Sequence, residues 1–251
     1  MLLEVNNVRK VYTTRLSTQS TEALKNVNFA VDNNEYVAIM GESGSGKTTL
    51  LNILATFDKA TSGSVLLKGQ DLSKLKDKDL ADFRRDNLGF VFQDFNLLDN
   101  FSVKDNILLP LVLANKNYKD MEKRLEKVIK PLGIEKLIDK YPYEISGGQK
   151  QRLTIARAML RKPAVLILDD STSAVDTATD SKIREAFFNH LPDTTVIIIA
   201  QRISSIQGAD NILVLDDGKV NGLGTHEELM ETNDLYRDIY ETQMKGAKGD
   251  E

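Results

Sequence analysis

The stretch GESGSGKT, from Gly41 to Thr48, decides the fold of this chain. It matches the pattern G-x-x-x-x-G-K-[ST], which is typical of loops that bind phosphate groups. The apolar segment YVAIM (36–40) before it predicts a buried strand, and TTLLNILAT (48–56) after it predicts a helix. An ordinary glycine-rich turn is the alternative interpretation. The strand–loop–helix order favours the phosphate-binding site over that alternative.

The residue types of this loop suit a nucleoside triphosphate. Glycines let consecutive main-chain N–H groups point at phosphate oxygens, and the N-terminus of the helix adds partial positive charge. Lys47 is expected to reach the β- and γ-phosphates, and the Thr48 hydroxyl is expected to bind Mg²⁺. The other loop residues predicted to contact nucleotide are Gly41, Ser43, Gly44, Gly46 and Thr49.

The composition is that of an ordinary soluble protein. The chain has 251 residues, is 41% hydrophobic and 28% charged, and carries a formal charge of -4. A broad nucleic-acid-binding surface is therefore not expected. The lack of cysteine excludes disulfides, thiolate metal sites and cysteine nucleophiles. No apolar run approaches the roughly 18–20 residues that cross a bilayer, and the N-terminus lacks a signal-peptide hydrophobic region. We expect a cytoplasmic chain.

Hydrophobic patterning predicts an α/β fold. We expect a P-loop core, in which a mixed sheet is flanked by helices, with an N-terminal antiparallel β subdomain and an inserted α-helical subdomain. The core would comprise residues 1–101 and 162–251, and the helical subdomain residues 102–161. Within the latter, Met121, Leu125, Val128 and Ile129 recur at helical spacing. Further expected elements are strands at 2–12, 23–31, 62–72, 87–93, 164–168 and 195–200, and helices at 77–85, 177–190 and 225–240. We also expect an exposed loop at 13–21, a hairpin at 211–220 with Asp-Gly at its turn, and a frayed tail at 245–251.

Two further segments carry chemistry. The apolar strand AVLIL (164–168) ends in Asp169, which suits a carboxylate that holds Mg²⁺, although apolar runs that end in Asp are common. In ISGGQKQR (145–152), Ser146, Gly147 and Gly148 open a predicted helix whose N-terminus could bind an anion. A plain helix cap formed by Ser146 is the alternative.

These segments together resemble a known family. GESGSGKT, Gln93 after a strand, ISGGQ, the strand ending in Asp169, and STSAVD (171–176) occur in the order found in the ATP-binding subunit of an ATP-binding-cassette (ABC) transporter. The resemblance covers essentially the whole chain, although the family usually has Leu where Ile145 stands. It implies ATP and Mg²⁺ as cofactors. It also implies a head-to-tail homo- or heterodimer of two nucleotide-binding domains, with transmembrane permease subunits as partners at the inner face of the membrane.

The resemblance also implies residue roles. Tyr12 would stack on adenine, and Gln93 would contact Mg²⁺ or the attacking water and sense the membrane partner. The γ-phosphate bound by the opposite subunit would be held by the signature residues Ser146, Gly147, Gly148 and Gln149. Asp176 would bridge the subunits. The simpler alternatives are an ordinary sheet aromatic for Tyr12 and a loop residue for Gln93.

Two positions depart from the family. Asp170 stands where the family usually has a Glu that acts as general base, and Gln201 stands where it usually has a His. A carboxylate set back by about an ångström can lower the rate by around 10²-fold. Gln can offer the γ-phosphate only neutral hydrogen bonds, which are weaker than charge-assisted ones. We expect a chain that binds MgATP and hydrolyses it slowly.

The two parts of the sequence resemble different branches. The text up to about Gln151 is similar to ATPases of bacitracin-type or lipoprotein-release transporters. From about Leu153 it is similar to the degenerate half of a heterodimeric exporter, which typically has Asp and Gln at the two departing positions. The sequence therefore suggests a composite of two parent sequences joined at a seam near residues 149–162. It could be a laboratory chimera or a natural recombinant. A single divergent ATPase is the alternative.

Other functions compete with a transport ATPase. A non-hydrolysing ATP-binding module would have the same motifs. A DNA-repair or chromosome-organising ATPase would carry a long coiled-coil insertion, and no sustained heptads appear. A P-loop kinase has no use for ISGGQ.

Overall fold

The computed structural model describes residues 1–13, 20–92, 94–169 and 192–248. The chain divides into two compact units, which are described separately below. Unit 1 comprises residues 1–85 and 195–251, and unit 2 comprises residues 86–194. The predictions for Gln93, Asp170, Asp176 and the helix at 177–190 lie outside the described residues.

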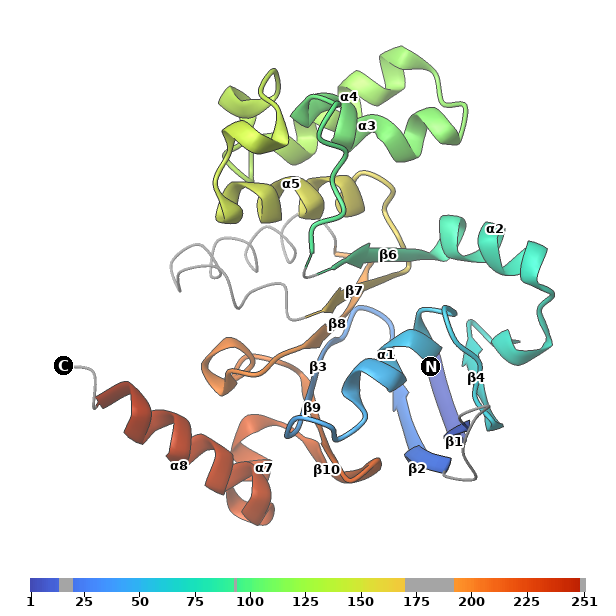
Figure 1. The fold of residues 1–251 in the computed structure, drawn as a ribbon, viewed down its shortest axis with the longest axis vertical. Coiled ribbons are helices and arrows are strands. Elements are labelled where there is room, and N and C mark those ends of the chain that lie inside the picture. Colours follow the sequence, from blue (N-terminus) through green and yellow to red (C-terminus); the bar gives the residue numbers. More distant parts are fainter. Residues whose placement is uncertain (14–19, 93, 170–191, 249–251) are drawn as a thin grey trace. The chain divides into compact units, whose positions relative to one another are not determined.

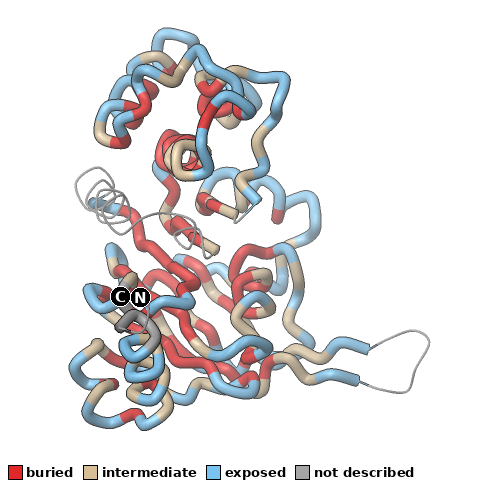
Figure 2. The backbone as a smooth tube through the Cα atoms, turned by 60° about the vertical axis from the view of Figure 1, so that its left-hand side comes forward, coloured by how far each residue is buried: buried red, intermediate tan, exposed pale blue. Residues whose placement is uncertain are grey.

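An antiparallel sheet forms the first part of unit 1. Its strands are β1 (Leu3–Thr13), β2 (Ser20–Val31), β4 (Ser62–Leu67) and β5 (Gln70–Asp71), in the order β2-β1-β4-β5. Alternate apolar side chains of β1 and β2 are buried, as the sequence pattern predicts. The far ends of both strands are exposed (Figure 2). Because β2 already begins at Ser20, the strand reaches into a segment that the sequence indicated as loop.

A second group of strands in unit 1 positions the phosphate loop. It consists of β3 (Tyr36–Met40), β8 (Thr195–Ile199), β9 (Asn211–Asp216) and β10 (Lys219–Gly224) (Figure 1). β3 lies between β8 and β9 and runs parallel to both. All residues of β3 and β8 are buried, which fits their continuous apolar character. The carboxyl ends of β3 and β8 therefore meet at one sheet edge, where the phosphate loop leads into α1 (Lys47–Leu54).

The hairpin β9–β10 turns at Asp217 and Gly218, as predicted. Both residues have positive φ, 42° and 75°, the conformation that a two-residue hairpin favours. The Gly218 N–H donates to the carbonyl of Ser45 at 3.1 Å, so the turn is tied to the phosphate loop. The sequence thus placed correctly a turn that also supports the candidate site.

Unit 1 ends in two helices, α7 (His226–Thr232) and α8 (Asp234–Lys248). The sequence indicated one helical segment at 225–240, but Asn233 adopts an extended conformation and separates two helices. The predicted frayed tail is wrong for residues 245–248, because α8 continues through Lys248. The Asn233 side chain bonds to Asn221 and to the N–H of Tyr236. This local bonding ends the first helix and starts the second.

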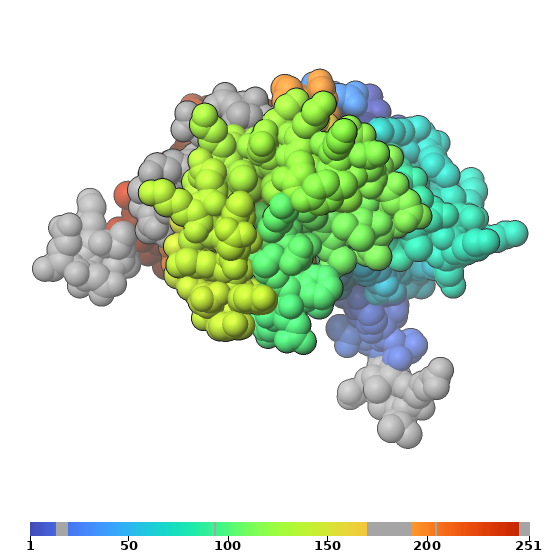
Figure 3. All heavy atoms as spheres, turned by 90° about the horizontal axis from the view of Figure 1, so that it is seen from above, coloured from blue at the N-terminus to red at the C-terminus, as the bar shows by residue number. Residues whose placement is uncertain are grey.

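Unit 2 combines two parallel strands with helices. The strands are β6 (Leu88–Val91) and β7 (Val165–Asp169), and the helices are α3 (Val103–Leu113), α4 (Tyr118–Ile129) and α5 (Gly147–Met159). α2 (Asp77–Asn87) runs across residue 85, where unit 1 ends. Residues 103–145 form one continuous green to yellow-green surface in Figure 3. The predicted α4 face is confirmed, because Met121, Leu125, Val128 and Ile129 are all buried.

Short 3-10 helices complete the described chain: η1 (Leu72–Lys74), η2 (Glu135–Leu137), η3 (Pro142–Glu144) and η4 (Ile203–Ser205). These elements confirm the predicted α/β class with its antiparallel sheet. Three helices fall inside residues 102–161, and the status of this segment as a separate subdomain stays a prediction. Within the described ranges, no helix has both the length and the apolar character needed to span a bilayer.

Candidate functional site

The phosphate loop requires glycine at two positions. Gly41 and Gly46 have φ of 151° and 104°. A Cβ atom on Gly41 would lie 2.1 Å from the Leu215 carbonyl oxygen, and one on Gly46 would lie 2.6 Å from that of Ala23. Any side chain would therefore push into neighbouring main chain. These glycines let the loop lie flat against the strands around it.

The start of α1 leaves its N–H groups available for an anion. Gly46 is the N-cap, offers no side-chain cap, and the first turn holds no acidic residue. Nothing would lie within 4 Å of a Cβ on Gly44, and the Thr48 side chain is exposed. A helix N-terminus without capping side chains attracts phosphate. The main chain of this loop therefore fits the triphosphate that the sequence indicates.

Lys47 lies over the loop that precedes it. Its ammonium donates to the carbonyl oxygens of Gly41 at 2.8 Å and Glu42 at 2.7 Å. Ser45, which the sequence analysis did not single out, is buried between these residues, and its hydroxyl has no hydrogen-bond partner among the described residues. The loop thus presents an ammonium group and main-chain donors within a few residues.

Tyr12 lies beside this loop. Its hydroxyl donates to Asp58 at 2.8 Å and also interacts with the Thr49 side chain. The Lys10 ammonium lies 4.8 Å from the centre of the Tyr12 ring and donates to Asp58 at 2.6 Å. Partial burial, and then the bond to Asp58, raise the pKa of the Tyr12 hydroxyl. Tyr12 as a whole residue is still 42% exposed, which leaves area for stacking.

Asp58 and Lys10 were not expected at the site. The pKa of Asp58 is lowered on balance: burial opposes the shift, but hydrogen bonds from Lys10, Tyr12 and the Lys59 N–H outweigh it. An ionised Asp58 accepts the bond from the Tyr12 hydroxyl and can thereby fix the orientation of the ring. Asp58 follows α1 and Lys10 lies in β1, so no short sequence motif joins them.

Gln201 lies at the same sheet edge as the phosphate loop. It follows β8, whose last residue, Ile199, pairs with Ile39 in β3. The Gln201 carbonyl accepts a 2.6 Å bond from the Gln243 side chain. Unit 1 thus brings together the phosphate loop, Tyr12 and the edge that carries Gln201.

Two of the predicted groups lie in unit 2. Asp169 is the last residue of β7 and is half-buried, and burial raises the pKa of its carboxyl group. Ser146 is the N-cap of α5 in a reciprocal capping box, because its hydroxyl accepts from the Gln149 N–H at 3.4 Å and Gln149 accepts from the Ser146 N–H at 2.9 Å. This is the cap that the sequence analysis named as the alternative role of Ser146. Gly147 and Gly148 open the first turn of α5, where Gly147 is exposed and Gly148 is half-buried.

Arg157 is a further unit 2 residue that sequence reasoning missed. From α5 its guanidinium donates to the carbonyl oxygens of Phe95 at 3.0 Å and Asn96 at 2.8 Å. Both acceptors have positive φ, and burial lowers the pKa of Arg157. Arg157 therefore ties α5, the helix that begins with the ISGGQ segment, to the main chain at residues 95 and 96.

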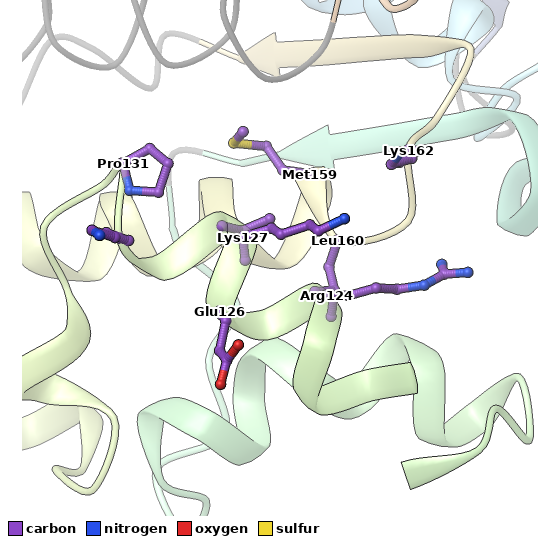
Figure 4. A pocket seen from close by; sticks show the side chains of 9 residues that line it. Arg124, Glu126, Lys127, Pro131, Met159, Leu160 and Lys162 are labelled. Atoms are coloured by element: carbon purple, nitrogen blue, oxygen red, sulfur yellow. The ribbon is translucent and has the colours of Figure 1, made fainter. Parts of the chain in front are cut away.

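A separate cavity of about 620 Å³ lies in unit 2 near the ends of α4 and α5. Pro131, Met159 and Leu160 supply apolar lining, and Glu126 points away from Met159 (Figure 4). None of the predicted site residues lines this cavity. Within the described part of the chain, no group of three His, Asp or Glu side chains could hold a metal. A magnesium site here would rely on few protein ligands, as is usual for Mg²⁺ bound with phosphates.

Comparisons with known proteins agree with the geometry. A family model described as "ABC transporter" matches residues 24–173. The chain is 39% identical to the bacitracin export ATP-binding protein BceA of Halalkalibacterium halodurans over 99% of both proteins. It is 36% identical to a putative export ATP-binding/permease protein of Rickettsia bellii, over 95% of this chain and 41% of that protein.

Two solved structures share the fold. A dimeric ATP-binding cassette in a post-hydrolysis state, bound to ADP and Pi, matches with a TM-score of 0.82 and 34% identity, over 89% of this chain and 98% of that one. A bacterial Atm1-family ABC exporter with ATP bound matches with a TM-score of 0.82 and 30% identity, over 96% and 42%. Single relatives align across residues 149–162, so the comparisons lend no support to the predicted seam, and the composite origin stays a prediction.

Proposed function

We propose a specific mode of action for this chain, which belongs to the ABC transporter family as an ATP-binding subunit: it captures MgATP at the phosphate loop and completes the site by pairing with a second nucleotide-binding domain. The relatives with solved structures support the pairing, since one is a dimer bound to ADP and Pi. The partner is a second copy or a related chain.

Each part of the nucleotide has a group to hold it. The N–H groups of residues 44–48 and the Lys47 ammonium bind the phosphates, together with Gly41, Ser43 and Thr49 at the loop's edges. Tyr12 stacks on the adenine. Thr48 and Asp169, with Gln93, hold Mg²⁺, which neutralises charge on the phosphates when it is bound. Ser146, Gly148 and Gln149 of one subunit contact the γ-phosphate held by the other.

The dimer would act on a membrane partner. BceA is named as a bacitracin export ATP-binding protein, and the Rickettsia protein as a fused ATP-binding/permease protein. By analogy, this chain drives transmembrane permease subunits from the inner face of the membrane. Gln93 senses the membrane partner, and Asp176 bridges the two nucleotide-binding subunits.

Hydrolysis would be slow. Asp170 stands at the position of the general base and Gln201 at that of the switch residue. The shorter carboxylate and the neutral amide each weaken the interactions that appear in the transition state. These two residues also favour a second candidate function, an ATP-binding module that hydrolyses nothing and regulates an active partner.

The geometry of Lys47 carries the proposal, because its ammonium lies on the carbonyl oxygens of Gly41 and Glu42 at the mouth of the loop. The test is titration of MgATP into the purified chain and the Lys47→Ala variant. Loss of charge-assisted bonds worth about 1.5–3 kcal/mol predicts a roughly ten- to hundredfold weaker affinity.

Lys74→Ala is the matched control, because Lys74 is an exposed lysine of η1 whose ammonium pairs with Asp71 at 3.1 Å, a residue outside the predicted nucleotide site. Thermal unfolding of both variants shows whether each remains folded. Equal MgATP affinity in a folded Lys47→Ala variant and its parent would refute the proposed site.

A further inference from the structure

The far end of α8 contacts the segment that follows β8. The Gln243 side-chain amide donates from Nε2 to the Gln201 carbonyl at 2.6 Å and accepts at Oε1 from the Ile203 N–H at 2.9 Å. One primary amide thus pairs with two main-chain groups on either side of Arg202. The bond from the Ile203 N–H has the usual length of an N–H···O bond, and the bond to the Gln201 carbonyl is slightly shorter.

The Ile203 N–H is a group that requires a partner. Ile203 is 1% exposed and begins the short helix η4, whose first N–H groups have no acceptor inside the helix. A buried N–H group without an acceptor destabilises the folded chain. Gln243 therefore stabilises the main chain at the point where it leaves the sheet edge.

The start of α8 is itself anchored. Tyr236 is fully buried, and its hydroxyl lies 2.7 Å from Nδ1 of His226 at the start of α7. The His226 ring also lies 5.5 Å from that of Tyr240. Asn233 ties the helix start to Asn221 in β10. In Figure 1, α7 and α8 follow the hairpin as the two red helices.

The spacing along α8 places Gln243 on the same face as the two tyrosines at the anchored start of the helix. Tyr236, Tyr240 and Gln243 occur at i, i+4 and i+7, so they share one helical face. A helix held rigidly at its first two turns positions a side chain on its third. The position of Gln243 is therefore set by packing at the start of α8, and its side chain contacts residues 201 and 203 two turns further along the helix.

We propose that Gln243 is a positioning residue for the γ-phosphate switch: it fixes the main chain at residues 201–203 and thereby orients the Gln201 side chain. This inference rests on the proposed function, because it assumes that Gln201 serves the bound nucleotide. It adds that the C-terminal helix, which carries no nucleotide-binding motif, sets the efficiency of the site.

The first measurement is amide hydrogen exchange at Ile203 in the nucleotide-free protein. Gln243→Ala leaves the buried Ile203 N–H without its acceptor, so exchange at Ile203 should become roughly five- to hundredfold faster, which corresponds to about 1–3 kcal/mol. Gln243→Glu keeps an acceptor for this N–H but turns a carboxylate oxygen toward the Gln201 carbonyl. Protection at Ile203 should then remain.

The second measurement is ATP turnover at saturating MgATP, with ADP affinity measured in parallel. Both variants lose the bond to Gln201, so turnover should fall roughly two- to tenfold, while ADP affinity, which depends on the phosphate loop, stays unchanged. Thr242→Ala is the control, since the Thr242 hydroxyl bonds within α8 itself, to the Asp238 carbonyl. It should change neither quantity.

The outcomes separate this inference from the proposed function. Unchanged exchange at Ile203 in Gln243→Ala overturns the contact, and faster exchange with unchanged turnover overturns its positioning role. If the parent chain binds ATP but does not turn it over, the hydrolysis part of the proposed function fails. The ratio of ATP to ADP affinity then decides: a ratio unaltered by Gln243→Ala overturns the inference.

Discussion

At the scale of the residue, Tyr12 has two separable parts. Its hydroxyl donates to Asp58 and its ring is available to a nucleobase. Tyr12→Phe keeps the ring, so ATP affinity should change little. Tyr12→Ala removes it, and because stacking of a base on an aromatic ring is worth about 1–3 kcal/mol, affinity should fall roughly five- to hundredfold. Titration with ATP measures both. Equal losses in the two variants would show that the hydroxyl, and not the ring, matters.

Asp169 shows an opposed effect of a single residue on stability and binding. Burial raises the pKa of its carboxyl group in the folded chain above the unfolded value. The folded state therefore binds the proton more tightly than the unfolded state does. As pH rises through the interval between the unfolded and the folded pKa, this carboxyl lowers the free energy of unfolding. Asp169→Asn should remove this decline. Without metal, the variant should be more stable than the parent above the interval, while MgATP affinity falls about tenfold or more because a predicted Mg²⁺ ligand is lost.

Asp217 supplies the control of opposite sign. The Lys25 ammonium lowers the pKa of the Asp217 carboxyl, so its ion pair contributes stability above the unfolded pKa that is lost as pH falls through the folded one. Asp217→Asn should thus weaken the fold at neutral pH, and Asp169→Asn should strengthen it. Urea unfolding measured between about pH 3 and pH 7, a range that includes the usual pKa values of carboxyl groups, compares the two variants. A decrease for both variants at neutral pH would contradict the account of Asp169.

At the scale of the element, two helices begin with the same device. Ser102 caps α3 and Ser146 caps α5, each in a reciprocal capping box. Ser102→Ala and Ser146→Ala should each lower the free energy of unfolding by about 0.5–2 kcal/mol. Only the second should weaken dimerisation driven by ATP, because only α5 carries the signature. Light scattering with and without MgATP measures this. Equal dimerisation of both variants would reduce Ser146 to a cap.

Elements defined by their own residues could be predicted from the sequence. The helix α4 shows a regular apolar face, and β3, β7 and β8 are short apolar runs between polar residues. The break between α7 and α8 could not be predicted, because helical periodicity continues through it. It depends on Asn233 bonding to Asn221 in another element.

The candidate site divides in the same way. The phosphate loop is a contiguous motif whose glycine requirements follow from main-chain geometry, so it could be located directly. The pairing of Asp58 with Lys10 and Tyr12, and of Gln243 with the 201–203 segment, joins residues far apart in the chain. Only tertiary packing brings them together. The Asp170 and Gln201 departures are visible in sequence only against the family's pattern, and their effect stays a prediction.

At the scale of the whole molecule, the rate of ATP hydrolysis tests whether Asp170 and Gln201 alone limit turnover at an otherwise complete nucleotide site. Asp170→Glu lengthens the carboxylate by one methylene, and Gln201→His introduces a ring that can carry charge. If these positions limit the rate, the double variant should hydrolyse MgATP about 10²-fold faster, the scale expected for correcting a misplacement of about an ångström. Affinity for MgATP should change little, because Lys47 and the loop are untouched.

Steady-state phosphate release measures the rate. Adding Lys47→Ala to the double variant should abolish the gain, which shows that the activity arises at this loop. A double variant no faster than its parent, with intact MgATP binding, would place the limit elsewhere in the dimer and favour the regulatory module.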